Sequence, residues 1–513
     1  MTVSSYEPTK IEEHQGKLSL PTRNRKSIWI SFALVLAILA SCTPVQPTIP
    51  VVINTPEPTS TPEPEITRTP IPARPVYAPS TLVDYIAQPG DSLISLANHF
   101  NTTPAEILEA NPLINKDITT LAAGLEMKIP IYYEALWGSQ FQIIPDSLFP
   151  NGPAQVGFNT AEFVDAQPGW LKSYSVIAGN KVRRGGDLID YVALTNSVSP
   201  RVLLAIADYM TGALSQPQLD PDRSMVPQDY EGQYSRGFYL QLIWVANTLN
   251  NGYYAWRNGR LDGITLADGK LEVPDPWQNA ASVALHHYYA QLYSGEDYKR
   301  AIYDDGFYAT YTRLFGDPWA NFQSHIPGNL QQPDLALPFA VGERWAYTGG
   351  PHAAWGSGEP LAAIDFAPGA IESGCVASLE FVVAVAEGQI VRSEYSIAVL
   401  DLDKDGDERT GWVIFYLHLG LNNRVNPGVL VKTGDPIGNP SCEGGSATGT
   451  HVHIARKYNG EWVDADSAVP FNLEGWIVRN GSAPYQGTLE RYGKIVTASD
   501  KGLTYSVITA GTK

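Results

Sequence analysis

The pattern of hydrophobic and polar positions changes several times along the chain. Residues 28–39 form an unbroken apolar run, too short for a comfortable membrane span and typical of the core of a signal peptide. Residues 43–80 are rich in Pro and Thr, which predicts an extended, polyproline II-like tether. Apolar positions recur at helical spacing over 198–212. Short apolar runs with glycine turns at 381–393 and 426–438 predict β-strands.

The N-terminal apolar run has the flanks of an export signal. Arg23, Arg25 and Lys26 precede it, and it ends in Leu39-Ala40-Ser41-Cys42, which resembles a bacterial lipobox. Residues 1–42 are therefore expected to be a lipoprotein signal peptide that ends at an acylated Cys42; an uncleaved anchor with an incidental cysteine is the alternative. Either way, the later residues are expected to be exported and lipid-anchored to the outer face of the cytoplasmic membrane or the cell envelope.

The composition narrows the class of protein. A chain of 513 residues is long enough for about three domains, and 44% hydrophobic residues exclude disorder along the whole length. The formal net charge of −18 argues against nucleic acid as a partner, because phosphate binding needs a basic surface.

Residues 84–131 predict a small βααβ module. Asp91 or Ser92 can cap a helix over 93–100, and Thr103 can cap a second helix over 104–111. The segment resembles a LysM domain in these matched elements: Gly90-Asp91-Ser92-Leu93, Phe100, Asn111, and Gly124-Leu125 through Pro130. The resemblance implies binding of glycans that contain N-acetylglucosamine; a helical module without a ligand is the alternative. His99 is expected on the surface of the first helix.

Residues 140–330 predict a mainly α-helical middle domain. The helix over 198–212 resembles the first catalytic helix of lysozyme-like lytic transglycosylases, but Met210 stands where the catalytic Glu should be. A thioether cannot protonate a glycosidic oxygen, and Asp208 points to a different helix face, so this chemistry is expected to be lost. The pair His286-His287 is interpreted as part of a helix packed by aromatic residues.

Four histidines and an aspartate after residue 350 form a candidate metal constellation. His352 precedes Asp365 by thirteen residues, His418 ends an apolar strand pattern, and His451 and His453 alternate in a further strand pattern. Side chains two apart in a strand point to one face, so the last two imidazoles lie side by side. A hydrolytic zinc ion takes three His or carboxylate ligands and a water. His352, Asp365 and one histidine of the pair can supply them, which leaves His418 to act on the water. Unrelated histidines are the alternative.

In these residues the chain resembles the lysostaphin/LytM-type zinc endopeptidases. The commonest branch has a His four residues before the Asp, where this chain has Leu361; a "GG-x-H" thirteen residues before Asp365 resembles the beta-lytic branch instead. The resemblance implies one Zn²⁺ ion held by His352, Asp365 and His453. It implies that His418 and His451 are the catalytic pair, which activates water and stabilises the oxyanion. The implied domain, 335–480, is mostly antiparallel β, followed by a C-terminal extension over 481–513.

Two further features lie in this domain. Cys375 and Cys442 fall in predicted loops of an exported domain, which predicts a disulfide. Residues 401–412 imitate the start of an EF-hand loop through Asp401, Asp403, Asp405 and Asp407, but position twelve is Trp412. A polar hairpin turn is the favoured interpretation, and a weak Ca²⁺ site is the alternative.

These features together predict a multidomain, lipid-anchored peptidoglycan endopeptidase. LysM would bind the glycan, a zinc-activated water would hydrolyse a stem or cross-bridge peptide bond, and Cys42 would attach the chain to the membrane. A non-catalytic peptidoglycan-binding or regulatory lipoprotein is the second hypothesis. A glycosidase acting through 140–330 is the third, and Met210 argues against it.

Overall fold

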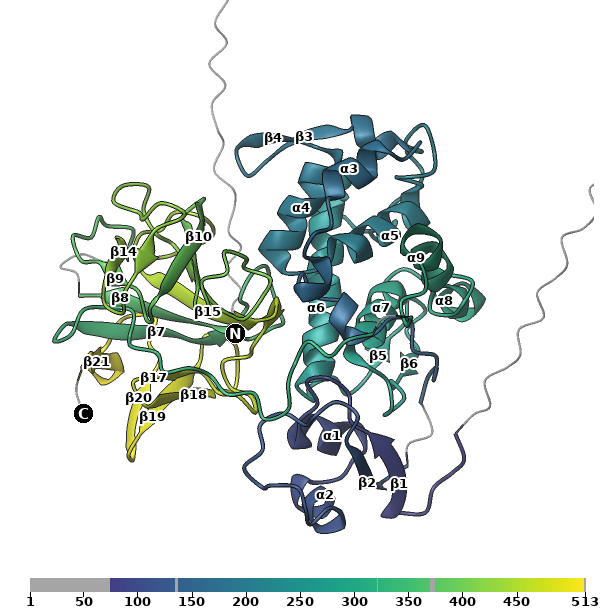
Figure 1. Ribbon diagram of the computed structural model, residues 1–513, viewed down its shortest axis with the longest axis horizontal. Helices are drawn as coiled ribbons and strands as arrows, with labels where there is room; N and C mark the ends of the chain where they lie inside the picture. The colour runs from purple at the N-terminus through teal and green to yellow at the C-terminus, as the bar shows by residue number, and fades with distance from the viewer. Residues whose placement is uncertain (1–73, 134–136, 321, 370–373, 512–513) are drawn as a thin grey trace, which may run out of the picture. The chain divides into compact units, whose positions relative to one another are not determined.

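The computed structural model describes residues 74–133, 137–320, 322–369 and 374–511 (Figure 1). The expected signal peptide, Cys42 and the tether up to residue 73 lie outside the described residues. Among the helices that are described, none is both long and apolar enough to cross a bilayer.

The first described module has the predicted βααβ order. Strands β1 (Thr81–Ile86) and β2 (Glu126–Ile131) pair antiparallel. Helices α1 (Leu93–His99) and α2 (Pro104–Ala110) lie between them in the chain. Ser92 and Thr103 cap the two helices, each accepting from the third residue of its helix. Asp91, the other predicted cap, instead accepts hydrogen bonds from the Tyr85 hydroxyl and the Gln88 amide.

His99 is buried, contrary to the surface position expected from the sequence. Its imidazole stacks on the Trp256 ring, with centroids 3.6 Å apart and planes at 6°, and its Nε2 lies 2.9 Å from the Trp256 carbonyl oxygen. An isolated module would expose this face of α1. The surface position is lost because helix α6 of the following domain packs there.

The middle of the chain is mainly helical, as predicted. Its helices are α3 (Thr160–Asp165), α4 (Gly185–Asn196), α5 (Pro200–Thr211), α6 (Phe238–Arg257), α7 (Ala280–Ala290), α8 (Gly295–Ala301) and α9 (Phe307–Phe315). Two antiparallel strand pairs accompany them: β3 (Ser175–Ala178) with β4 (Lys181–Arg184), and β5 (Ile264–Thr265) with β6 (Leu271–Glu272). The 3-10 turns of this part are η1 (Asp146–Leu148), η2 (Pro153–Gln155), η3 (Trp170–Ser173) and η4 (Gln233–Ser235). His286 is fully buried on α7 between buried aromatic residues, so the packed-helix interpretation is confirmed for it.

A large antiparallel sheet follows. Its order is β13-β10-β11-β12-β15-β8-β7-β21, with β16 beside β15. The strands are β7 (Arg344–His352), β8 (Ala363–Pro368), β10 (Gly388–Glu394), β11 (Ile397–Asp401), β12 (Trp412–Leu417), β13 (Leu430–Val431), β15 (Val452–Tyr458), β16 (Glu461–Trp462) and β21 (Val507–Thr509). A separate pair joins β9 (Val382–Val383) to β14 (Pro436–Gly438).

Both faces of the sheet centre are covered. Val399 and Phe415 pack into the core that contains the middle-domain helices, whereas Leu400 and Ile414 pack into a second core on the other face. Neighbouring strand residues point to opposite faces, so β11 and β12 are buried along most of their length, and the apolar runs 397–400 and 413–417 fill both cores.

Residues beyond 480 are joined to this sheet. A four-stranded sheet, β17-β18-β19-β20, is formed by β17 (Asn472–Leu473), β18 (Trp476–Asn480), β19 (Gly487–Arg491) and β20 (Lys494–Thr497). After the 3-10 turn η5 (Thr504–Ser506), β21 pairs with β7. The segment predicted as an extension therefore supplies an outer strand of the sheet that carries the candidate site.

Candidate metal centre

Four neighbouring strands bring the predicted site residues together. His352 is the last residue of β7, Asp365 lies within β8, and His453 lies within β15. Asp365 is directly opposite His453 in the β8–β15 pairing, and His453 is opposite Leu417 of β12. His418 follows Leu417, so the register alone places the residues of the constellation at one end of these strands.

The two predicted histidine ligands converge on one carboxylate oxygen of the third predicted ligand, Asp365. Asp365 Oδ1 lies 3.3 Å from His352 Nε2 and 3.4 Å from His453 Nδ1, and the two ring nitrogens are 3.0 Å apart. All three residues are buried, and their ligand atoms fall within 4.8 Å of one another. The pairing of β7 with β8 thus brings His352 close in space to Asp365 and His453, although it is distant from them in sequence.

Backbone carbonyls fix which ring nitrogens carry protons. His352 Nδ1 lies 2.8 Å from the Gly350 carbonyl oxygen, and His453 Nε2 lies 3.1 Å from that of Ala354. A carbonyl oxygen only accepts, so each of these nitrogens carries the hydrogen and the other nitrogen presents a lone pair. His352 Nε2 and His453 Nδ1 therefore face each other with lone pairs, next to a carboxylate.

This donor set fits a divalent cation. Asp365 Oδ1 is buried and has no hydrogen-bond partner among the described residues. A buried carboxylate and two facing imidazole lone pairs repel one another unless a cation lies between them. Two imidazoles and one carboxylate are also the ligand types that zinc prefers in hydrolases.

His418 and His451 form a second pair beside this group. Their ring centroids are 4.5 Å apart, and His451 Nε2 lies 3.8 Å from Asp365 Oδ1. Each Nδ1 donates to a backbone carbonyl, that of Glu443 for His418 and that of Gly449 for His451, both at 2.7 Å. Burial, and then the nearby His451, lower the pKa of His418 to about 4. The His418 ring is therefore neutral at neutral pH, with Nε2 free to accept a proton.

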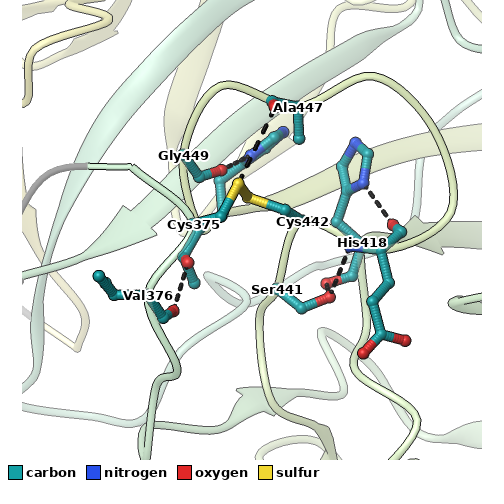
Figure 2. The surroundings of a disulfide bond; sticks show 10 residues. Cys375, Val376, His418, Ser441, Cys442, Ala447 and Gly449 are labelled. Carbon is teal, nitrogen blue, oxygen red and sulfur yellow. Dashed lines mark hydrogen bonds between the residues drawn. A yellow bond between two sulfur atoms is a disulfide. The ribbon is translucent and has the colours of Figure 1, made fainter. Parts of the chain in front are cut away.

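The disulfide predicted from the sequence is present, and it adjoins this pair. Cys375 and Cys442 form a disulfide bond. In Figure 2 Gly449 is drawn on one side of this disulfide and His418 on the other. Ser441, next to Cys442, donates its amide to the His418 carbonyl at 2.7 Å and accepts from the His451 amide at 3.3 Å. The disulfide therefore braces the backbone segment that connects the two histidines.

Sequence reasoning missed two contributors to the site. Tyr485 stacks on His352, and Ala354 orients His453 through its carbonyl. Neither residue type suggests a metal site, and Tyr485 lies far along the chain in the predicted extension. The glycines that follow Ala354, in Trp355-Gly356-Ser357-Gly358, were the only local signal of a closely docked loop.

The other candidate sites take less specific forms. Residues 402–411 connect β11 to β12, so the predicted polar hairpin is confirmed. Asp401, Asp403 and Asp405 gather there, but the fourth predicted position, Asp407, is paired with Arg409 at 2.6 Å.

In the middle domain Asp208 is buried; it accepts from the amides of Leu214 and Ser215 and pairs with Arg313. Those contacts assign Asp208 a structural role.

Comparison with known proteins adds a family context. Residues 142–329 match the family model of the LasA N-terminal domain, and residues 85–130 match that of the LysM domain. Protease LasA of Pseudomonas aeruginosa is 26% identical over 348 residues, which cover 64% of this chain and 78% of that protein. The beta-lytic metalloendopeptidase of Achromobacter lyticus is 29% identical over 166 residues, 31% of this chain and 41% of the relative.

Among solved structures, the M23 metalloprotease pseudoalterin matches with 26% identity and a TM-score of 0.28, over 33% of this chain and 96% of its own. The sequence matches relate the chain to metallopeptidases. More narrowly, they support the LytM type, with an N-terminal LysM domain and a segment similar to the N-terminal domain of LasA. The lysozyme-like relationship expected for residues 140–330 is not confirmed.

Proposed function

We propose that this chain is a zinc-dependent endopeptidase that hydrolyses stem or cross-bridge peptide bonds of peptidoglycan. The observation that carries the proposal is the convergence of His352 Nε2, His453 Nδ1 and the unpartnered Asp365 Oδ1 on one point. These three residues would hold one Zn²⁺ ion. When bound, zinc would polarise the scissile carbonyl and lower the pKa of the attacking water.

His418 and His451 would act on the reacting groups from the side of the metal centre. His418 Nδ1 donates to the Glu443 carbonyl, so Nε2 can accept a proton from the attacking water. His451 has the same arrangement through Gly449 and lies closer to Asp365. We assign His418 and His451 together to proton transfer and to stabilisation of the oxyanion that forms at the scissile carbon.

The proposal extends to the ends of the chain. The LysM module would bind N-acetylglucosamine-containing glycan, and acylation of Cys42 would tether the exported chain to the cell envelope. Titration of the zinc-free chain with N-acetylglucosamine oligomers separates glycan binding from cleavage. Metabolic labelling with a fatty acid, compared between wild type and Cys42→Ala, tests the anchor, and equal labelling of both would remove it.

Digestion of purified peptidoglycan with mass analysis of the products tests the peptidase. Wild type should release fragments with new amine termini. His352→Ala should lose both zinc and cleavage, whereas His451→Ala should keep zinc and lose cleavage. His287→Gln is a matched control, because His287 lies on α7 and its ring, among the described residues, hydrogen-bonds the Thr248 carbonyl and no residue of the metal centre. Full zinc occupancy without any wild-type cleavage would instead favour the non-catalytic peptidoglycan-binding hypothesis, and new sugar ends would favour a glycosidase.

A further inference from the structure

The loop that follows His352 orients a proposed metal ligand. Ala354 accepts the Nε2 hydrogen of His453 at 3.1 Å, which leaves His453 Nδ1 aimed at Asp365 and His352. The loop closes on itself through a hydrogen bond from the Ala354 amide to the Pro360 carbonyl at 3.1 Å. The position of the Ala354 carbonyl therefore depends on how residues 353–360 are held.

Helix α6 of the middle domain holds this loop through two asparagines. Asn247 Oδ1 accepts from the Ser357 amide at 2.8 Å, and Asn251 Oδ1 accepts from the Glu359 amide at 2.7 Å. Asn251 is four positions after Asn247, so both side chains lie on one face of α6. Together they hold the loop at two of its backbone amides, those of Ser357 and Glu359.

Two glycines allow the loop to approach the helix this closely. Gly356 has φ 77° and Gly358 has φ 84°, a backbone region that favours glycine. A Cβ atom on either residue would lie 2.3 Å from the Oδ1 of the facing asparagine, Asn247 or Asn251 respectively. The close approach of the loop to α6 therefore depends on glycine at both positions, in addition to the two hydrogen bonds.

A third contact fixes the loop at its far end. Arg260, just after α6, donates Nε to Glu359 Oε1 at 2.9 Å and also pairs with Asp464. Trp355, in the same loop, packs against the shared core beside Phe415. The loop is therefore held on both sides, by the sheet that carries His453 and by the middle domain.

We propose that Asn247 and Asn251 are positioning residues for the metal centre. By holding the loop 353–360 they keep the Ala354 carbonyl on His453 Nε2, and so keep His453 Nδ1 directed to the metal. The middle domain is then part of the metal centre's support. This inference rests on the proposed function in one respect, the role of His453 as a zinc ligand.

Loss of the two asparagine oxygens should reduce zinc affinity while leaving all three ligands in place. Groups that orient a ligating histidine typically change metal affinity by about 10- to 100-fold when they are removed. For Asn247→Ala/Asn251→Ala in the full chain we expect zinc binding to be weakened by about tenfold or more. Asn247→Asp keeps an acceptor oxygen for the Ser357 amide and should retain wild-type affinity.

The test is a competition titration of the full-length apo-protein with zinc and a chromophoric chelator. Asn258→Ala is the matched control at the C-terminal end of α6: among the described residues its Nδ2 donates to the Tyr254 carbonyl and not to the loop, so its zinc affinity should equal that of wild type. Gly358→Ala perturbs the docking from the loop side and should also weaken zinc, without any change in α6. Urea unfolding of each apo-variant identifies those that fail to fold.

The outcomes separate the two proposals. If wild type binds no zinc at His352, Asp365 and His453, the proposed function fails. If wild type binds zinc and the folded double alanine variant and Gly358→Ala bind it equally tightly, the positioning role of Asn247 and Asn251 is overturned. Weaker zinc binding in both of these variants, with Asn258→Ala and Asn247→Asp unchanged, supports it.

Discussion

The ring of Tyr485 stacks on the imidazole of His352, with centroids 4.1 Å apart and planes inclined by 19°. Two backbone hydrogen bonds fix this contact: the Gly350 amide donates to the Tyr485 carbonyl at 2.8 Å, and the Tyr485 amide donates to the Pro351 carbonyl at 3.0 Å. The segment after residue 480 therefore covers one face of a proposed zinc ligand.

Truncation of this ring should loosen His352. An aromatic contact of this kind contributes about 0.5–1.5 kcal/mol, so Tyr485→Ala should weaken zinc binding by roughly fivefold. Tyr485→Phe keeps the stacked ring and should bind zinc as wild type does. A chelator competition assay measures both variants. Equal zinc affinity of the alanine variant and wild type would show that the stacking does not restrain His352.

The Cys375–Cys442 disulfide should stabilise both the domain and the catalytic pair. The bond closes a loop with a sequence separation of 67, which on the chain-entropy model stabilises by about 4 kcal/mol. Cys375→Ser/Cys442→Ser should lower the urea midpoint accordingly and reduce cleavage more than it reduces zinc affinity. That difference is expected because Cys442 adjoins the backbone that contacts His418 and His451. Intact mass with and without reductant verifies the bond in wild type; two free thiols under native conditions would contradict the assignment.

Arg257 joins three parts of the chain through buried polar contacts. Its Nη1 donates to the Pro89 carbonyl at 2.5 Å, its Nη2 lies 3.0 Å from Asp146, and its Nε lies 2.9 Å from Glu461. Burial would raise the pKa of Glu461, but the Arg257 charge outweighs it and lowers that pKa to about 2.

Removal of this arginine should leave two buried carboxylates without their cation, although Glu461 keeps its contacts with His325 and Tyr253. Arg257→Met is expected to cost about 3–5 kcal/mol of unfolding free energy. Arg257→Met/Glu461→Gln should cost less than the sum of the two single changes, because it does not leave the charge of Glu461 unpaired. A double-mutant cycle by urea unfolding measures the coupling. A cost below about 1 kcal/mol for Arg257→Met would contradict a stabilising role for the cluster.

Buried neutral histidines should make the fold sensitive to acid. Burial lowers the pKa of His286 to about 3, and neither ring nitrogen has a hydrogen-bond partner among the described residues. The unfolded chain has the ordinary histidine pKa near 6.5, so between about pH 6.5 and 3 it binds a proton that the folded chain does not. The free energy of unfolding should therefore decrease as the pH is lowered through this window, by about 1.4 kcal/mol per pH unit for this group.

His286→Leu should remove that contribution. The slope of unfolding free energy against pH, measured between pH 6.5 and 4 on the zinc-free protein, should be smaller in the variant by about 1.4 kcal/mol per unit. His99 is a second such group, because burial, assisted by the charge of Arg257, lowers its pKa to about 3. Identical slopes for wild type and His286→Leu would contradict the burial of a neutral ring at this position.

The sequence determined the features that depend on neighbours in the chain. The caps at Ser92 and Thr103 arise from hydrogen bonds over three residues, and the alternation of His451 and His453 places two imidazoles on one strand face. The polar hairpin after Asp401 was predictable for the same reason. The disulfide, with a sequence separation of 67, was predictable on other grounds, because Cys375 and Cys442 both fall in loops of a domain expected to be exported.

Only the tertiary structure decided the contacts that join distant segments. His99 is buried because α6 packs on α1, Tyr485 reaches His352 through its backbone hydrogen bonds to Gly350 and Pro351, and Asn247 and Asn251 meet the loop at 357–359. Each contact spans more than 100 residues of chain, and none of these residue types has a local pattern that marks its partner. Long-range packing selects such partners by shape and by the burial of polar groups, and a single sequence records neither.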